Sequence, residues 1–183
     1  MSLVFSSRLE PGERILWEGR PDKRRFVLGP ENLYLIPFSV MWGGFAIFWE
    51  ASVLAGGAPF FFWLWGIPFV LVGVYLIAGR FVVAAAQADR THYAVTDKRV
   101  LIASGFLSTT LQELDLRTLP FLQLTEGRRG VGTISFTMPT PWSVYARSGW
   151  TGFGTGQDVG FHSVPDAAAV YRTIQHARGE ASR

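Results

Sequence analysis

The stretch from Leu33 to Gly79 constrains this chain more than any other feature, because its 47 residues contain one charged side chain, Glu50. The 32 residues before it carry 11 charges, and the 104 residues after it carry 19. The apolar excess of the chain is therefore local. A length of 183 residues allows one average domain or a smaller domain with a membrane anchor, and this distribution favours the anchor.

Two apolar runs within this stretch are each long enough to cross a bilayer. Leu33–Leu54 has 22 residues and would rise about 33 Å as a helix, close to the roughly 30 Å of hydrocarbon. Pro59–Gly79 has 21 residues and no charge. Only Ala55–Ala58 separate the runs, so we expect an antiparallel transmembrane hairpin over residues 33–79. Cations flank this hairpin and are absent from its loop, which predicts that both termini are cytoplasmic.

A signal peptide and the buried hairpin of a water-soluble protein are the alternatives to this interpretation. The first run begins after 32 residues, is about twice as long as the apolar region of a signal peptide, and is followed by a second run. A buried hairpin would need a large protein around it. Within the hairpin, small residues offer low-profile surfaces for close packing, namely Ser39, Gly43, Gly44, Gly66 and Gly73.

Short β-rich segments follow the hairpin, and one precedes it. In residues 1–32, Ile15–Trp17 predicts a short strand that docks on the C-terminal domain or lies against the membrane. Thr91–Thr96 and Arg99–Ser104 flank the dipeptide Asp97-Lys98 and predict a β-hairpin, in whose turn Asp97 accepts backbone N–H bonds. Further strands are predicted at Leu107–Leu114, Leu119–Thr125 and Thr133–Thr137. This spacing of strands is typical of an antiparallel barrel or sandwich in residues 80–183.

The chain closes with an amphipathic pattern over Val164–Arg178, which predicts a helix that plugs the open end of the barrel. Ser163 and Asp166 have the spacing of a capping box, and Gly179 stands at the predicted end. An irregular Gly-rich and aromatic loop, residues 138–160, lies before this helix.

The sequence contains no pattern that predicts catalysis. There is no cysteine, and His92, His162 and His176 lack a metal-ligand spacing. The Gly-rich stretch Gly149–Gly160 lacks a phosphate-loop lysine. We therefore expect no enzyme activity, no metal and no cofactor, and the scattered cations predict no nucleic-acid partner. Glu50 is expected to reach headgroups or a loop amide near the outer end of its helix, and a small transporter or an enzyme is the less favoured alternative.

Several motifs together resemble bacterial pleckstrin-homology-like (PH-like) membrane proteins with two transmembrane helices. These motifs are Gly12-Glu-x-Ile-Leu-Trp-x-Gly-Arg-Pro21, Thr91-x-Tyr-Ala-Val-Thr-Asp-Lys-Arg-Val-Leu-Ile102, Gly132-Thr-Ile-Ser-Phe136 and Val170-Tyr171. The resemblance implies a membrane α-helical hairpin plus an α+β cytoplasmic domain. That domain would be a PH-like, split and partly open antiparallel β-barrel of about seven strands, capped by the C-terminal helix and without catalytic residues.

The function expected from these features is a membrane-anchored binding or scaffolding module at the inner leaflet of the bacterial cytoplasmic membrane. Candidate contacts to anionic lipid headgroups are Arg80, Arg90, Lys98, Arg99, Arg128 and Arg129. A purely structural role in the turn is the alternative for Arg99. Aromatic side chains of the loop are candidates for contact with lipid or protein, namely Trp142, Tyr145, Trp150 and Phe153.

The loop at residues 138–160 has two alternatives to a contact role. It is either an ordered loop folded on its own barrel or a disordered insertion. Besides the bilayer, the expected partner is a protein or a second copy of the chain. A self-assembling accessory subunit of a larger membrane complex is the alternative function.

Overall fold

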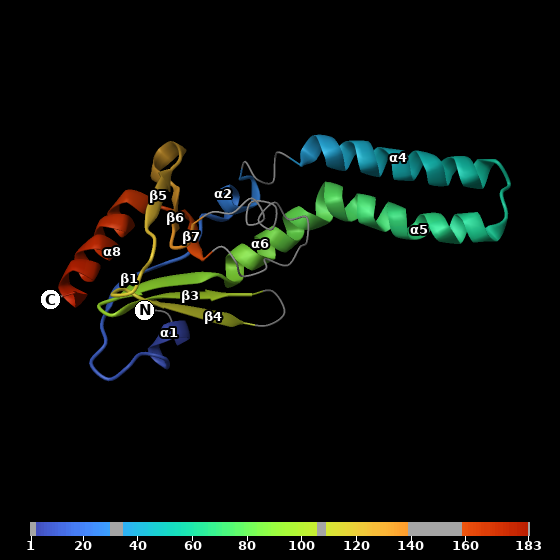
Figure 1. The fold of residues 1–183 in the computed structure, drawn as a ribbon. Helices are drawn as coiled ribbons and strands as arrows, with labels where there is room; N and C mark the ends of the chain where they lie inside the picture. Colours follow the sequence, from blue (N-terminus) through green and yellow to red (C-terminus); the bar gives the residue numbers. More distant parts are fainter. Residues whose placement is uncertain (1–2, 30–34, 106–108, 139–158, 183) are drawn as a thin grey trace.

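The structure is a computed structural model of the chain, and it describes residues 3–29, 35–105, 109–138 and 159–182. A long pair of helices extends from one end of a domain built of two sheets and a C-terminal helix (Figure 1). Three short elements complete the described fold. They are α1 (Leu3–Ser6), α2 (Lys23–Val27) and the 3₁₀ turn η2 (Arg128–Gly130).

The two apolar runs form helices that are long and apolar enough to cross a membrane. The first is α4 (Ile36–Ala55), with a mean hydropathy of 1.4. The second has a mean hydropathy of 2.2 and comprises α5 (Phe60–Val74), the π-helical segment η1 (Tyr75–Gly79) and α6 (Arg80–Arg90). The second helix therefore continues beyond Gly79 and enters the domain without a linker (Figure 1).

Small residues line the contact between α4 and the second helix, as their low profile predicts. Ser39, Gly43 and Ala46 are buried on α4, and Gly66 and Gly73 are buried on α5. A Cβ added to Gly73 would lie 2.9 Å from the Cα of Gly43, so the two backbones approach too closely for a side chain there. Gly44 faces open space and takes no part in this contact.

The first sheet has the order β1-β2-β3-β4 and is antiparallel throughout. Its strands are β1 (Ile15–Gly19), β2 (His92–Thr96), β3 (Arg99–Ser104) and β4 (Thr110–Asp115). The predicted β2–β3 hairpin is thus present. The N-terminal strand β1 pairs with β2, so the N-terminal segment docks on the domain instead of lying against a membrane.

The second sheet has the order β5-β6-β7. Its strands are β5 (Gln123–Glu126), β6 (Gly132–Ser135) and β7 (Gly160–Val164). The antiparallel sheets of the predicted barrel are present, but in the described part of the chain they stay separate and form no closed barrel. The chain leaves the ladder after β4 because Leu116 and Leu119 are drawn into the core and Pro120 has no N–H to donate.

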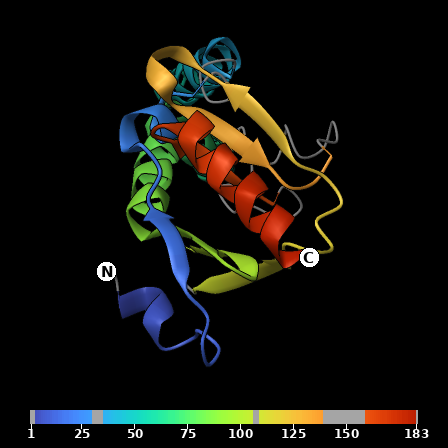
Figure 2. The ribbon, with the colours of Figure 1, turned by 90° about the vertical axis from the view of Figure 1, so that its left-hand side faces the viewer.

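The helix α8 (Ala167–Ala181) runs across the opening between the two sheets (Figure 2). Its apolar face meets a shared core that includes Val100, Ile134 and Phe161. The sheets are also bridged by Tyr93 of β2, whose Oη accepts the backbone N–H of His162 in β7 at 3.1 Å. The predicted helix is therefore confirmed, and it covers an open two-sheet core.

The start of α8 differs from the predicted capping box. Ser163 belongs to β7, and Asp166 is itself the residue before the helix, with a left-handed backbone (φ 50°) and no side-chain cap hydrogen bond. The helix also continues through Gly179 to Ala181. The first difference arises because β7 takes the residues that the spacing assigned to the cap.

Candidate functional site

The most specific motif of the sequence forms a charged junction between the N-terminal segment and the β2–β3 hairpin. The guanidinium of Arg99 donates from Nε to Oε1 of Glu13 at 2.9 Å and from Nη2 to Oε2 at 2.8 Å. It also donates from Nη1 to Glu113 and from Nη2 to the carbonyl of Arg8 at 3.0 Å. Planar bidentate pairing of this kind fixes both orientation and position. Arg99 therefore fastens the N-terminal segment to the sheet.

Glu13 is the buried partner in this junction. Its side chain is fully buried, and Oε2 also accepts the backbone N–H of Glu10 at 2.8 Å. Burial by itself would raise the pKa of Glu13, but hydrogen bonds from Arg99, Glu10 and Thr96 and the charge of Arg99 together lower it to about 2. The carboxylate is thus charged at neutral pH.

The β2–β3 turn is stabilised by Thr96. Its hydroxyl oxygen accepts the backbone N–H groups of Lys98 at 3.2 Å and Arg99 at 2.9 Å. Asp97, which we expected to do this, instead accepts the backbone N–H of Arg14 at 3.0 Å. Lys98 forms an exposed ion pair with Glu10 at 2.9 Å, and the hydrogen bond to Glu10 raises the pKa of Lys98.

This junction lies at the end of the first sheet that is remote from α4 and α5 (Figure 1). Between the hairpin and the turn lie the 11 residues of α6, which rise about 16 Å, and the five residues of β2, which rise about 17 Å. A bilayer around α4 and α5 would therefore be far from Lys98 and Arg99. Since both side chains are also paired with carboxylates, we leave them out of the headgroup surface that the sequence suggested.

The other predicted contact residues are distributed over several elements. Arg80 and Arg90 lie at the two ends of α6, and Arg129 is exposed in η2 with φ 64°. The side chain of Arg128 lies outside the described residues. So do the aromatic candidates of the loop, Trp142, Tyr145, Trp150 and Phe153. Of the described candidates, Arg80 lies at the end of the hairpin and Arg90 at the far end of α6.

Two buried ionisable side chains, Glu50 and Arg80, lie near opposite ends of the helical hairpin. The carboxylate oxygens of Glu50 are buried and have no hydrogen-bond partner among the described residues. The carboxylate lies against Gly66, where any Cβ would overlap Oε2. Glu50 is therefore directed to the neighbouring helix and not to headgroups or a loop amide. Arg80 is 2% exposed, and its Nε, Nη1 and Nη2 also lack partners among the described residues.

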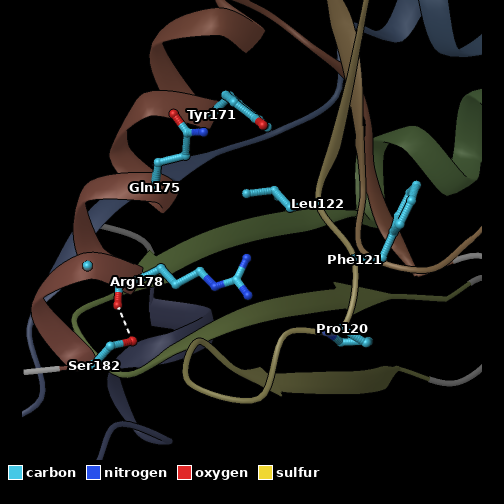
Figure 3. A pocket seen from close by; sticks show the side chains of 8 residues that line it. Pro120, Phe121, Leu122, Tyr171, Gln175, Arg178 and Ser182 are labelled. Carbon is cyan, nitrogen blue, oxygen red and sulfur yellow. Dashed lines mark hydrogen bonds between the residues drawn. The ribbon is translucent and has the colours of Figure 1, made fainter.

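A groove of about 540 Å³ lies between α8 and the segment that leads into β5. Residues 120–122 form one wall, and the polar side chains on the α8 side are Tyr171, Gln175, Arg178 and Ser182. Figure 3 shows the side chains of Arg178 and Leu122 extending from opposite walls into it. Arg178 donates from Nη2 to the carbonyl of Leu119 at 3.1 Å. The groove adjoins β5, which is an edge strand of its sheet.

No group of three or more His, Asp or Glu side chains in the described part of the chain is placed to hold a metal ion. The features that the described residues do form are ion pairs that fasten segments together, a groove beside an edge strand, and two buried ionisable side chains in the apolar helices.

Two antiparallel sheets, a C-terminal helix across their opening and an apolar helical hairpin define a PH-like module with two possible membrane helices. A family model described as Bacterial PH domain matches residues 43–178, and the chain belongs to this family. No curated protein and no solved structure matches the chain. The matched region begins within α4, so it leaves out β1 and Glu13.

Proposed function

We propose that the protein is a membrane-anchored binding or scaffolding module whose PH-like domain faces the inner leaflet. The observation that carries this proposal is the outer surface of the helical hairpin. Only 17% of each apolar window is buried inside the structure, and large side chains such as Phe45, Phe48, Phe61 and Trp65 are more than half exposed. An apolar surface of this size requires an apolar environment. The bilayer is that environment.

The position of β1 supports a topology with both termini on one side of the membrane. β1 precedes the hairpin and β2 follows it, yet these strands are hydrogen-bonded neighbours. Both ends of the hairpin therefore leave it toward the same domain. The cations of α2 and α6 surround this end, and the positive-inside rule puts it in the cytoplasm.

A continuous helix and a clamp hold the domain close to the bilayer. The second helix runs without a break from Phe60 to Arg90, and Lys23 of α2 pairs with Asp89 of α6 at 2.6 Å. Tethering raises the effective concentration of the domain at the membrane to roughly millimolar. Weak contacts therefore suffice, both with headgroups at the α6 end and with a protein partner.

The surface best suited to a protein partner is the groove beside β5. An extended segment can add to the free edge of β5 and place a side chain in the groove. The residues that line the groove include the cation Arg178 and no acidic residue. This charge favours a partner segment with a carboxylate.

Crosslinking and pull-down of the full-length chain from native membranes tests the proposal. Gln175→Arg places a bulky side chain in the groove, whereas His176→Arg, at the next and exposed position of α8, is the matched control. We expect the wild type and the His176→Arg variant to capture the same partner and the Gln175→Arg variant to capture several-fold less. Equal capture by all three would contradict the groove. Recovery of the chain in the supernatant after ultracentrifugation without detergent would contradict the anchor.

A further inference from the structure

We propose that Arg80 forms a binding site for the phosphate group of a phospholipid at the cytoplasmic end of the helical hairpin. The inference rests on the membrane topology proposed above and goes beyond it by naming the ligand chemistry and the residue. Arg80 is 2% exposed, and none of its three guanidinium nitrogens has a hydrogen-bond partner among the described residues.

A guanidinium in this state requires an anion. Unlike a carboxylate, it cannot escape its charge by exchanging a proton at physiological pH, and burial of an unpaired charge is costly. The nearest acids in the described parts of the two helices do not supply the anion. Asp89 lies nine residues further on, about 13 Å along α6, and pairs with Lys23. Glu50 is level with Gly66, about 21 Å along the helix from Arg80.

The geometry of the side chain suits a phosphate. The Cζ atom of Arg80 lies 4.7 Å from the centre of the Phe81 ring, so one face of the guanidinium is covered by an aromatic side chain. Its N–H groups lie in the plane of the guanidinium and are buried without a hydrogen-bond partner among the described residues. Two parallel N–H···O bonds to a phosphate are the pairing for which this planar group is suited.

The height of Arg80 along the hairpin matches the phosphate layer of a bilayer. The two antiparallel helices have Glu50 against Gly66 and Gly43 against Gly73, so residues whose numbers add to 116 lie at the same level. By this register Arg80 is level with Ile36, the first residue of α4. That level is the cytoplasmic end of the apolar hairpin, where phospholipid phosphates lie. The π-helical turn directly before Arg80 is a feature often found at functional sites.

Native mass spectrometry of the full-length chain in detergent tests the site. The delipidated protein is titrated with phosphatidylglycerol, with a galactolipid that has no phosphate, and with inorganic phosphate. We expect one phosphatidylglycerol to be retained by the wild type, and its affinity to fall about tenfold or more in Arg80→Gln. Arg80→Lys keeps the charge without the planar fork and should fall between them. Arg172→Gln, an exposed cation of α8, is the matched control and should bind like the wild type.

The outcomes distinguish a lipid phosphate from free phosphate, and they also show whether Arg80 forms the site. If inorganic phosphate binds as tightly as phosphatidylglycerol, the ligand of Arg80 is free phosphate and not a phospholipid. Equal retention of both lipids, or retention that is unchanged in Arg80→Gln, would overturn the site. Circular dichroism establishes that each variant is folded, and Arg80→Lys carries the test if Arg80→Gln is not. The anchor is judged separately, because extraction that requires detergent is expected for every variant.

Discussion

At the scale of single residues, a buried ion pair joins side chains 86 positions apart. Glu13 is fully buried and receives two hydrogen bonds from Arg99, whereas Glu113 receives one and is 40% exposed. We predict that Glu13→Gln lowers the free energy of unfolding by about 1–3 kcal/mol, because a buried charged hydrogen-bond partner is lost. Glu113→Gln should cost less than about 1 kcal/mol, as exposed ion pairs do. Chemical denaturation in detergent, followed by circular dichroism, measures both.

The carboxylate of Glu13 also makes the free energy of unfolding depend on pH in the acid range. The pKa of Glu13 is about 2 in the folded chain and 4.5 without the fold. Because the folded pKa is the lower one, the contribution of Glu13 is complete above pH 4.5 and is lost as the pH falls from 4.5 toward 2. Glu13→Gln should therefore flatten the stability profile in this window. A variant profile as steep as that of the wild type would show that other carboxylates cause the acid sensitivity.

The sequence indicated Arg99 as a notable residue, but not its role. The motif around Arg99 predicted a turn and placed a cation beside it. Contact with a lipid headgroup and a structural role were therefore both open for Arg99. Nothing local pairs Arg99 with Glu13, since the turn after Glu10 brings Glu13 to the sheet only when β1 is in register with β2. For the same reason Asp97 was assigned to its own turn, whereas its partner Arg14 comes from the N-terminal segment.

At the scale of elements, adjacent glycines of α4 allow a direct test of helix packing. A Cβ on Gly43 would overlap Ile77 and lie 3.4 Å from the carbonyl of Gly73, whereas a Cβ on Gly44 meets nothing within 4 Å. We predict that Gly43→Leu destabilises the hairpin by about 1–3 kcal/mol through overpacking. Gly44→Leu should have little effect or a small stabilising one, because it adds a good helix former on an open face. Thermal unfolding in detergent compares the two variants, and equal effects would contradict the helix contact described above.

Local patterns predicted the elements whose sequence and environment agree. The two apolar runs became helices, and the β2–β3 pair and α8 formed where alternation and helical spacing predicted them. β7 was missed because Gly160 was assigned to the irregular loop and Ser163 to a helix cap. Its pairing with β6 depends on residues 25 or more positions away, which no local pattern contains. The strand ladder is interrupted near Pro120, between β4 and β5. This interruption depends on the burial of Leu116 and Leu119 in the core, which no local pattern contains.

At the scale of the whole molecule, the apolar hairpin is an insertion in a domain whose first strand precedes it. β1 completes the edge of the first sheet, α2 lies beside α6, and Asp22 donates its backbone N–H to the carbonyl of Ser163 in β7 at 2.7 Å. A fragment that starts after the hairpin therefore lacks an edge strand and leaves β2 exposed. An uncovered edge of this kind tends to pair with other chains.

We predict that residues 88–183 alone aggregate or fold only in part, and that residues 1–28 joined to residues 88–183 by a short Gly/Ser linker form a soluble, folded monomer. The ends to be joined are close, because α2 packs against α6. Size-exclusion chromatography and the dispersion of amide signals in NMR spectra compare the two proteins. If the fragment misfolds because it lacks the N-terminal segment, Glu13→Gln should make the joined protein behave more like the fragment of residues 88–183. A well-folded fragment without residues 1–28 would show that β1 and its ion pair are dispensable, and the hairpin would then be an N-terminal anchor and not an insertion.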